Sequence, residues 1–355
     1  MKKSMKTMMT LLLAAILVVS MGTGALAEEP TGEALIYETV SPAVLGVYAM
    51  AETWSRDAGA STAEKDYGTG LYVDERGYVL TCWHLIEDAD FVEIETADGT
   101  RIRAAEILSD STVDVAVLKL EEPLEDVQPL TLGGEAAIGQ NVSVLANAFD
   151  AYGIYPAQLT TGVVSGLNGS IDRAANFSRS FDLIRTDAVI GYGGCGGALL
   201  DENGALIGMT VRLIDSDGNE SSNAFTSAIP VATLEKVMGD LIEYGTVKRP
   251  RMGVMVVDND GPEEAIKNYP PCGCLVSEVE AGGPADKAGL LTYDIITAID
   301  GVRTRSFAEM SRELDRHEAG DTITVTVYRC ADPETGAFLE TAEYIDVQLT
   351  LEVLD

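Results

Sequence analysis

The stretch Gly191-Tyr192-Gly193-Gly194-Cys195-Gly196-Gly197 is the most informative part of the sequence. Five of its seven residues are glycine, which indicates a backbone with unusual dihedral angles or one that approaches a ligand closely. Its letters contain both a dinucleotide-binding fingerprint and a nucleophile elbow with cysteine, but each of those motifs requires a helix directly after the turn. Residues 198–208 predict a β-hairpin instead, so both interpretations fail.

A third interpretation fits the hairpin. A glycine turn before a nucleophile can direct the N–H groups of Gly193 and Cys195 at one point, which is an oxyanion hole for acyl transfer. A nucleophilic thiol also needs a general base, and the chain has only two histidines. His84 follows a predicted strand, whereas His317 ends a charged helix and is predicted to be a solvated surface residue. His84 is therefore the candidate base, with a buried core histidine as the alternative.

A carboxylate is then needed to hold the correct tautomer of the histidine. Asp114 is the candidate, because it lies just ahead of the apolar strand predicted over 115–120. The order histidine, aspartate, nucleophile along the chain is that of the trypsin-like fold.

Short strands separated by glycine and aspartate are predicted through the first two thirds of the chain. The clearest hairpin signal is Asp98-Gly99, between apolar runs over 91–96 and 100–108. Further strands are expected over 70–73, 78–81, 115–120, 141–146, 159–166, 198–200 and 205–211. This pattern is typical of antiparallel β-barrels rather than of a parallel sheet with crossover helices.

The pattern changes at Pro230. Apolar residues at helical spacing predict a helix over 231–244, which Gly245 ends. The basic, proline-containing stretch 248–251 is expected to be a hinge, and beyond it lie about 100 residues with their own strands and one helix near 307–316. The sequence therefore predicts a second domain.

Residues from about 39 to 247 resemble the HtrA (Deg) family of trypsin-like proteases. Residues 68–70 with 78–84 resemble its G-S-G-F and G-Y-I-L-T-N-N-H segments, and 114–119 resemble its D-L-A-V-L-K. Residues 161–165 resemble T-x-G-I-V-S, 186–188 resemble T-D-A, and 193–198 stand where the family has G-N-S-G-G-P. The resemblance implies a double antiparallel β-barrel, a peptidase with His84, Asp114 and Cys195 as its triad, unfolded or damaged proteins as substrates, and a homotrimer.

The glycine loop departs from the family at three positions. Cys195 replaces the serine, Gly194 the asparagine and Ala198 the proline. A thiol beside His84 can ionise and attack a peptide carbonyl, although sulfur is larger than oxygen and changes the reach. Three functions stay open: a cysteine endopeptidase, an inactive pseudoprotease that binds peptides or acts as a chaperone, and a thiol redox sensor built on Cys195 with Cys82 near it.

Residues from about 251 to 353 are similar to the bacterial PDZ domain that follows such proteases. The similarity lies in residues 275–279, 283–290, 294–296 and 300–301. It implies that the loop Arg251-Met252-Gly253-Val254 receives a peptide C-terminal carboxylate while the peptide adds as a β-strand. Met310 and Leu314 would line the side-chain pocket, with ordinary core residues as the alternative.

Residues 1–27 predict a signal peptide. Lysines come first, an apolar run follows over 8–21, and Ala25-Leu26-Ala27 provides a cleavage site. We therefore expect an exported protein, with a retained membrane anchor as the alternative. The expected organisation is signal peptide 1–27, N-terminal segment 28–40, trypsin-like domain 41–230, linker helix and hinge 231–250, and PDZ domain 251–355.

Charge and cysteine content limit the partners. The formal net charge of -33 argues against nucleic acid and anionic membranes as partners. Five cysteines leave at least one free thiol. One disulfide among Cys272, Cys274 and Cys330 is possible but cannot be assigned. Two histidines make a zinc centre hard to assemble, so no metal and no cofactor are expected.

Overall fold

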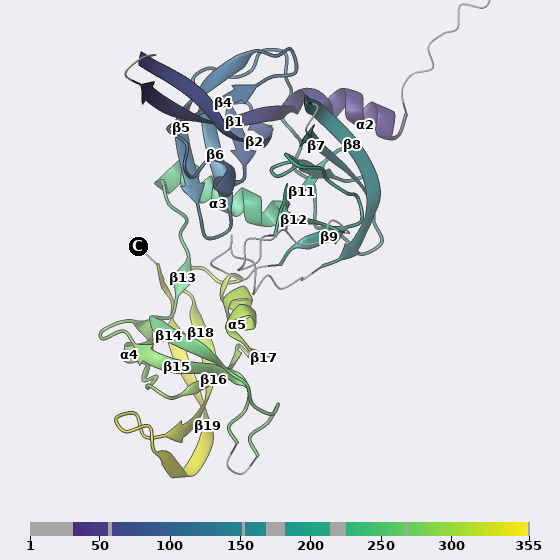
Figure 1. The fold of residues 1–355 in the computed structure, drawn as a ribbon. Coiled ribbons are helices and arrows are strands. Elements are labelled where there is room, and N and C mark those ends of the chain that lie inside the picture. The colour runs from purple at the N-terminus through teal and green to yellow at the C-terminus, as the bar shows by residue number, and fades with distance from the viewer. Residues whose placement is uncertain are drawn as a thin grey trace, which may run out of the picture.

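The computed structural model describes residues 31–55, 59–150, 153–167, 182–213, 225–266 and 269–353. The signal peptide predicted over 1–27 lies outside these residues. The chain is mainly β, with two closed barrels of six strands each, a helix, and a second β-rich unit (Figure 1). In the part of the chain that is described, no helix has the length and apolar character to cross a membrane.

The first barrel follows helix α2 (Glu33–Val40) and the short helix η1 (Ser41–Ala43). Its strand order is β1-β2-β3-β6-β5-β4, and the hairpins expected around residues 74–78 and 96–100 are confirmed. The short helix η2 (Trp83–Leu85) follows β3. The strands are β1 (Val44–Ser55), β2 (Gly59–Asp74), β3 (Tyr78–Thr81), β4 (Phe91–Glu95), β5 (Arg101–Asp110) and β6 (Val115–Leu120).

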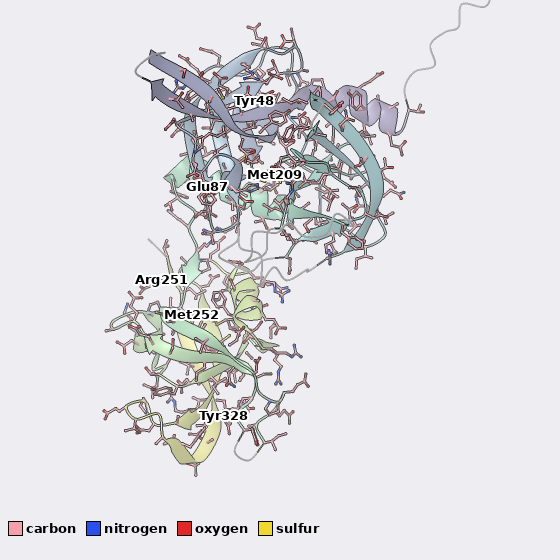
Figure 2. All side chains as sticks on the ribbon, viewed as in Figure 1. Tyr48, Glu87, Met209, Arg251, Met252 and Tyr328 are labelled. Atoms are coloured by element: carbon pink, nitrogen blue, oxygen red, sulfur yellow. The ribbon has the colours of Figure 1, made fainter. Side chains whose placement is uncertain are left out.

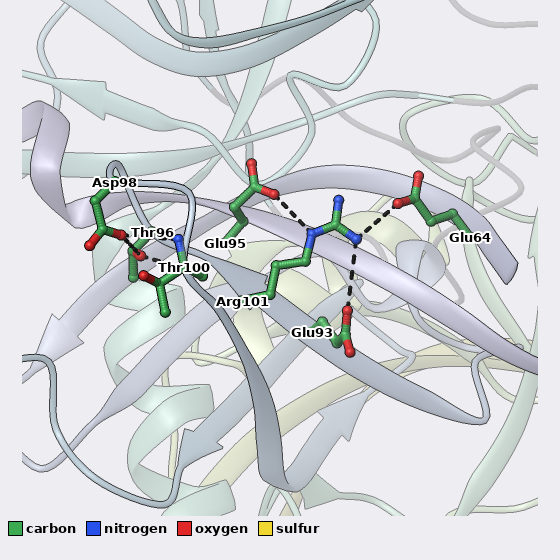
Figure 3. Close-up of polar contacts among 7 residues, drawn as sticks. All are labelled: Glu64, Glu93, Glu95, Thr96, Asp98, Thr100 and Arg101. Atoms are coloured by element: carbon green, nitrogen blue, oxygen red, sulfur yellow. Dashed lines mark hydrogen bonds and ion pairs between the residues drawn. The ribbon is translucent and has the colours of Figure 1, made fainter. Parts of the chain in front are cut away.

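Side-chain contacts fix the β4–β5 hairpin. In its turn, the Asp98 carboxylate accepts a hydrogen bond of 2.6 Å from the Thr96 hydroxyl and one of 3.0 Å from the Thr100 N–H (Figure 3). Just beyond the turn, Arg101 lies with its guanidinium over the Tyr48 ring. That guanidinium is paired with three carboxylates from β2 and β4, those of Glu64, Glu93 and Glu95 (Figure 3). The hairpin predicted from the sequence is thus stabilised by side-chain contacts within its turn and with neighbouring strands of the barrel.

The second barrel has the strand order β10-β11-β12-β9-β8-β7. The chain after the glycine loop forms the β10–β11 hairpin, closed by a hydrogen bond of 2.9 Å from Asp201 N–H to Ala205 C=O. The sequence predicts a hairpin rather than a helix after the loop, and the structure has this hairpin. The strands are β7 (Asn141–Asp150), β8 (Gly153–Gly166), β9 (Ile184–Thr186), β10 (Ala198–Leu200), β11 (Leu206–Val211) and β12 (Thr226–Pro230).

Helix α3 (Val231–Tyr244) has the predicted bounds, with Gly245 as its C-cap. Its buried face carries Leu234, Val237 and Leu241, which belong to a hydrophobic cluster that also contains residues of both barrels. The helix therefore ties the two barrels together before the chain leaves them.

The second unit is a sheet of order β14-β15-β16-β18-β19, with β17 paired to β16. The helix predicted near 307–316 is present as α5 (Phe307–Leu314), and a second helix that the local pattern did not indicate comes before it. Helix α4 (Pro284–Ala288) has only five residues, too few to show a helical period. The remaining elements are β13 (Pro250–Arg251), β14 (Val254–Asn259), β15 (Gly273–Val279), β16 (Ile295–Ile299), β17 (Val302–Arg303), α5 (Phe307–Leu314), β18 (Thr322–Ala331), β19 (Phe338–Thr350) and β20 (Glu352–Val353).

The basic stretch 248–251 is held by contacts on both sides rather than being a free hinge. Arg249 forms a short, two-pronged ion pair with Asp110 at the end of β5. Immediately after it, β13 pairs with β20. The stretch therefore connects the first barrel to the second unit through a partly buried charge pair and a strand pairing.

Replacing Arg249 by alanine should destabilise the protein by about 3 kcal/mol, because it leaves the buried Asp110 carboxylate without its counter-charge. Arg76→Ala is the matched control, since that arginine pairs with Asp74 while its side chain is 62% exposed. Exposed pairs contribute at most about 1 kcal/mol. Denaturant unfolding of both variants checks this, and equal losses would contradict a structural role for the Arg249 pair.

All five cysteines are free thiols. The disulfide considered among Cys272, Cys274 and Cys330 does not form. Cys274 is fully buried, and burial raises the pKa of its thiol to about 12. Cys330 is also buried, and burial raises the pKa of its thiol, so Cys274 and Cys330 are packing residues, in contrast to the pair near the glycine loop described next.

Candidate active site

His84 and Asp114 meet where β3 and the β5–β6 turn come together. His84 Nδ1 lies 2.7 Å from Asp114 Oδ2, and the backbone N–H of His84 donates to Asp114 Oδ1 at 2.8 Å. The Trp83 N–H also donates to the Asp114 carbonyl at 3.3 Å. One aspartate thus holds both the imidazole ring and the backbone that carries it.

Asp114 is fully buried and has a φ of 57°. This left-handed conformation is uncommon for a residue with a side chain, although aspartate and asparagine tolerate it better than most. A strained residue persists only where the surrounding contacts determine it. The bonds to His84 and Trp83 are such contacts, and they fix the carboxylate in line with the imidazole.

Cys195 lies at the end of the glycine loop, 3% exposed. Its thiol lies near enough to His84 and Cys82 for both side chains to act on its pKa. Its carbonyl accepts a hydrogen bond of 2.9 Å from Thr69 N–H in β2 of the first barrel. The structure therefore brings together the three residues predicted as a triad, His84 and Asp114 from the first barrel and Cys195 from the second.

The surroundings favour the charged forms of both Cys195 and His84. The hydrogen bond with Cys82, opposed by burial and supported by His84, lowers the pKa of the Cys195 thiol to about 5. Burial alone would lower the pKa of His84, but its hydrogen bonds and charge interactions with Asp114 and Cys195 outweigh burial and raise that pKa to about 10. A thiolate beside an imidazolium is the reactive form of a nucleophilic cysteine.

Two glycines of the loop are required by its backbone. Gly193 and Gly196 have φ values of 85° and 83°, in the region that favours glycine. A Cβ on Gly196 would also lie 2.0 Å from the carbonyl oxygen of Thr69. The loop therefore packs directly against the first barrel, which no larger residue at Gly196 would allow.

The N–H groups of Gly193 and Cys195 have no hydrogen-bond acceptor among the described residues. Their neighbours Gly194, Gly196 and Gly197 all donate to protein carbonyl groups. These two donors are therefore available to a ligand, and an oxyanion hole requires such available donors.

Two threonines that the sequence did not single out hold this loop. The Thr210 hydroxyl donates to the Gly194 carbonyl at 2.6 Å and accepts from the Gly197 N–H at 2.8 Å. The Thr69 hydroxyl donates to the Gly193 carbonyl at 2.9 Å. Both threonines are fully buried, and a threonine within a strand carries no signal that would distinguish it from an ordinary β residue.

The prediction for His317 was wrong in part. Its side chain is only 19% exposed, and its Nε2 lies 3.7 Å from the Asp300 carboxylate within the second unit. Asp300 is 17 positions away in the sequence, so local sequence does not reveal this contact. It belongs to a different unit from Cys195, so His84 is the histidine of the site.

A metal ion is not assigned to the site. Cys82, His84 and Asp114 each offer a ligand atom within 4.8 Å of the others. Both oxygens of the Asp114 carboxylate, however, are already bonded to His84. The group therefore acts as a hydrogen-bonded unit around His84.

A groove of about 590 Å³ lies between β14 and α5 in the second unit. Arg251 and Met252 lie at the end of this unit nearest the barrels (Figure 2). Met310 and Leu314 belong to the core of the unit and also line the groove. The two interpretations of these residues, as pocket lining and as core, are therefore compatible. All six residues proposed for peptide binding line it: Arg251, Met252, Gly253, Val254, Met310 and Leu314.

Comparison with known proteins identifies both parts of the chain. Residues 68–209 match the trypsin-like peptidase domain family, and residues 250–337 match the PDZ domain family. The fold and site thus define a trypsin-like peptidase domain followed by a PDZ domain.

This combination is that of HtrA-type proteins, to which the chain is similar over both parts. Protease Do-like 1, chloroplastic, of Arabidopsis thaliana is 34% identical, over 74% of this chain and 60% of that protein. Periplasmic serine endoprotease DegP of Escherichia coli (strain K12) is 29% identical, over 74% and 54%. The chain thus covers less than two thirds of these relatives' own length.

Solved structures agree with this assignment. The HtrA-type protease AlgW with decapeptide superposes with a TM-score of 0.69 and 25% identity, over 90% of this chain and 98% of that chain. The serine endoprotease from Yersinia pestis gives a TM-score of 0.61 with 26% identity, over 92% and 100%. The Escherichia coli and Yersinia pestis proteins are named serine endoproteases, whereas the loop in this chain carries Cys195.

Proposed function

We propose that this protein is an endopeptidase that uses Cys195 as its nucleophile. The observation that carries the proposal is the Cys195 thiol beside an imidazole whose Nδ1 is bonded, at 2.7 Å, to the buried Asp114. His84 is the general acid and base, and Asp114 orients it. The N–H groups of Gly193 and Cys195 form the oxyanion hole.

The reaction follows from these positions. The Cys195 thiolate attacks the peptide carbonyl carbon, and the two free N–H groups stabilise the oxygen that becomes negative. His84 gives its proton to the departing amine, which leaves a thioester on Cys195. His84, now neutral, takes a proton from water as the water attacks the thioester. The carboxylic acid product leaves, and the thiolate and imidazolium are restored.

Unfolded or damaged exported proteins are the proposed substrates. The predicted signal peptide and the periplasmic location in the name of the Escherichia coli relative support export. The proposed PDZ ligand is a peptide C-terminus, since β14 is the edge strand of its sheet and lies beside the groove. A homotrimer is the proposed assembly, by similarity to the family.

The test is cleavage of casein, an unfolded substrate, by the mature protein under reducing conditions. Wild type should cleave it, and iodoacetamide should stop cleavage. Cys195→Ala should have no activity above background, with Cys274→Ala as the matched control that keeps full activity. Wild-type cleavage that survives in Cys195→Ala would overturn the proposal.

The second candidate function is peptide binding without hydrolysis. The PDZ groove favours it, because all of its predicted lining is in place without any contribution from Cys195. Intact binding by a wild-type protein that fails to cleave casein would select this function over the endopeptidase.

Peptide binding should depend on a free terminal carboxylate. The Arg251 guanidinium at the groove has its Nε without a hydrogen-bond partner among the described residues. The loop around Gly253, ahead of β14, offers backbone N–H groups. A peptide with an apolar last residue should lose about tenfold in affinity, or 1.4 kcal/mol, when its C-terminus is amidated. Fluorescence anisotropy measures this, and equal affinity for acid and amide would exclude carboxylate recognition.

A further inference from the structure

The proposed mechanism leaves one thiol of the site unused. Cys82 directly follows β3, is completely buried, and donates a hydrogen bond from Sγ to the Thr210 carbonyl at 3.6 Å. The same carbonyl accepts from the Gly196 N–H at 2.8 Å, and Cys82 Sγ lies within 4.8 Å of a His84 ring nitrogen, so the Cys82 thiol lies against the loop next to Cys195. Two free thiols, one from each barrel, therefore face each other beside His84.

Burial restricts what each thiol can meet. Cys195 is 3% exposed and opens to the site, while Cys82 has no exposed surface at all. A small oxidant can reach Cys195, but a bulky thiol such as glutathione cannot reach Cys82. Cys82 can react only with a group formed on Cys195, and its fixed position there gives the high effective concentration of an intramolecular partner.

We propose that Cys82 and Cys195 form a redox pair: a hydroperoxide oxidises Cys195, and Cys82 then closes a disulfide with it. The observation that assigns the pair is the Thr210 carbonyl at the barrel boundary, which accepts from both Cys82 Sγ and the N–H of Gly196, the residue next to Cys195. Cys195 is the attacking sulfur and Cys82 the resolving one. The ligand class is a small hydroperoxide, and the protein reduces it to an alcohol or to water.

The electrons and protons balance over two steps. The Cys195 thiolate attacks the terminal peroxide oxygen; the O–O bond breaks, an S–O bond forms, and His84 protonates the departing alkoxide or hydroxide. Cys195 is then a sulfenic acid. The Cys82 sulfur attacks the Cys195 sulfur, the S–O bond breaks, and hydroxide leaves as water with the Cys82 proton passed through His84. Two thiols are oxidised by two electrons and one peroxide is reduced.

The local electrostatics supports this division of roles. The pKa of the Cys195 thiol is lowered, which makes it the thiolate that attacks a peroxide, whereas burial raises the pKa of the Cys82 thiol well above its ordinary value. Cys82 thus stays protonated until a sulfenic acid forms next to it. The disulfide would remove the nucleophile until a dithiol reduces it. Oxidation would therefore stop cleavage, and this consequence rests on the proposed function. The disulfide itself does not.

Peptide mass spectrometry tests the pair in the full mature protein. After treatment with a molar excess of hydrogen peroxide and alkylation of remaining thiols, wild type should give a peptide linking residues 82 and 195, two hydrogens lighter than the reduced pair. Dithiothreitol should restore nearly all alkylation of Cys195. In Cys82→Ala, Cys195 should proceed to sulfinic acid, and less than about a tenth should be recovered by dithiothreitol. Cys274→Ala, which removes another fully buried thiol, should behave as wild type.

Folding is controlled with a second variant, Cys82→Ser, and with near-ultraviolet circular dichroism of both. Sulfinic acid on Cys195 of wild type with Cys82 still reduced would overturn the proposal, as would equal recovery in wild type and Cys82→Ala. A linked peptide in a protein that never cleaves casein would support the redox pair and contradict the endopeptidase. Cleavage of casein without any linked peptide would support the endopeptidase and contradict the redox pair.

Discussion

Replacement of His84 by alanine should lower kcat/KM for casein by about 10³-fold. The imidazole has two roles in the proposed mechanism: it stabilises the Cys195 thiolate as its counter-charge and it protonates the departing amine. The substitution removes both roles together.

His317→Ala is the matched control for His84→Ala. It removes the other histidine of the chain, which lies in the PDZ domain beside Asp300, and should leave cleavage unchanged. A His84→Ala protein that cleaves casein within tenfold of wild type would contradict the role of His84 as acid and base.

Thr210→Val should lower kcat by about 10²-fold, which is the effect of losing one oxyanion-hole donor. Valine has the shape of threonine but no hydroxyl, so the Gly194 carbonyl and the Gly197 N–H lose their bonds to Thr210 and keep only the 3.2 Å bond between them. A loop that has lost these two buried hydrogen bonds no longer holds the N–H groups of Gly193 and Cys195 in place.

Thr210→Ser retains the hydroxyl and should stay within a few-fold of wild type. Alkylation of Cys195 by iodoacetamide requires no oxyanion hole, so it should continue at the wild-type rate in Thr210→Val and show that the thiol and His84 remain in place. Loss of alkylation together with cleavage would mean that the variant has disrupted the whole site, and unchanged cleavage would refute a positioning role for Thr210.

The order of the elements was predictable from local sequence, because their signals are local. Turn residues such as Asp98 mark hairpins whatever surrounds them, and the apolar spacing of 231–244 defines α3 with its bounds. Strand β1 and the first part of β2 were not predicted. Glu52 and Thr53 lie on exposed strand ends of this hairpin, where alternation with buried residues fades and the period of two disappears.

The site was predictable as far as its residues have unusual chemistry. His84 stood out because histidine is rare in this chain, and Cys195 because of the glycines around it. Thr69, Thr210 and Cys82 could not be found this way, since their roles come from contacts between two barrels. Cys82 and Cys195 are 113 positions apart in the sequence, and only the packing of the barrels brings them together.

The rate of Cys195 alkylation by iodoacetamide as a function of pH tests the thiolate–imidazolium pair most directly. Only the thiolate reacts, and it is present above the pKa of the thiol, which is lowered to about 5 in the folded protein. Wild type should therefore reach its full rate by about pH 6–7, well below the ordinary thiol pKa near 8.5, while His84→Ala should shift the midpoint upward. A wild-type midpoint near that ordinary value, unmoved by His84→Ala, would contradict a catalytic Cys195 and favour a protein that binds peptides without cleaving them.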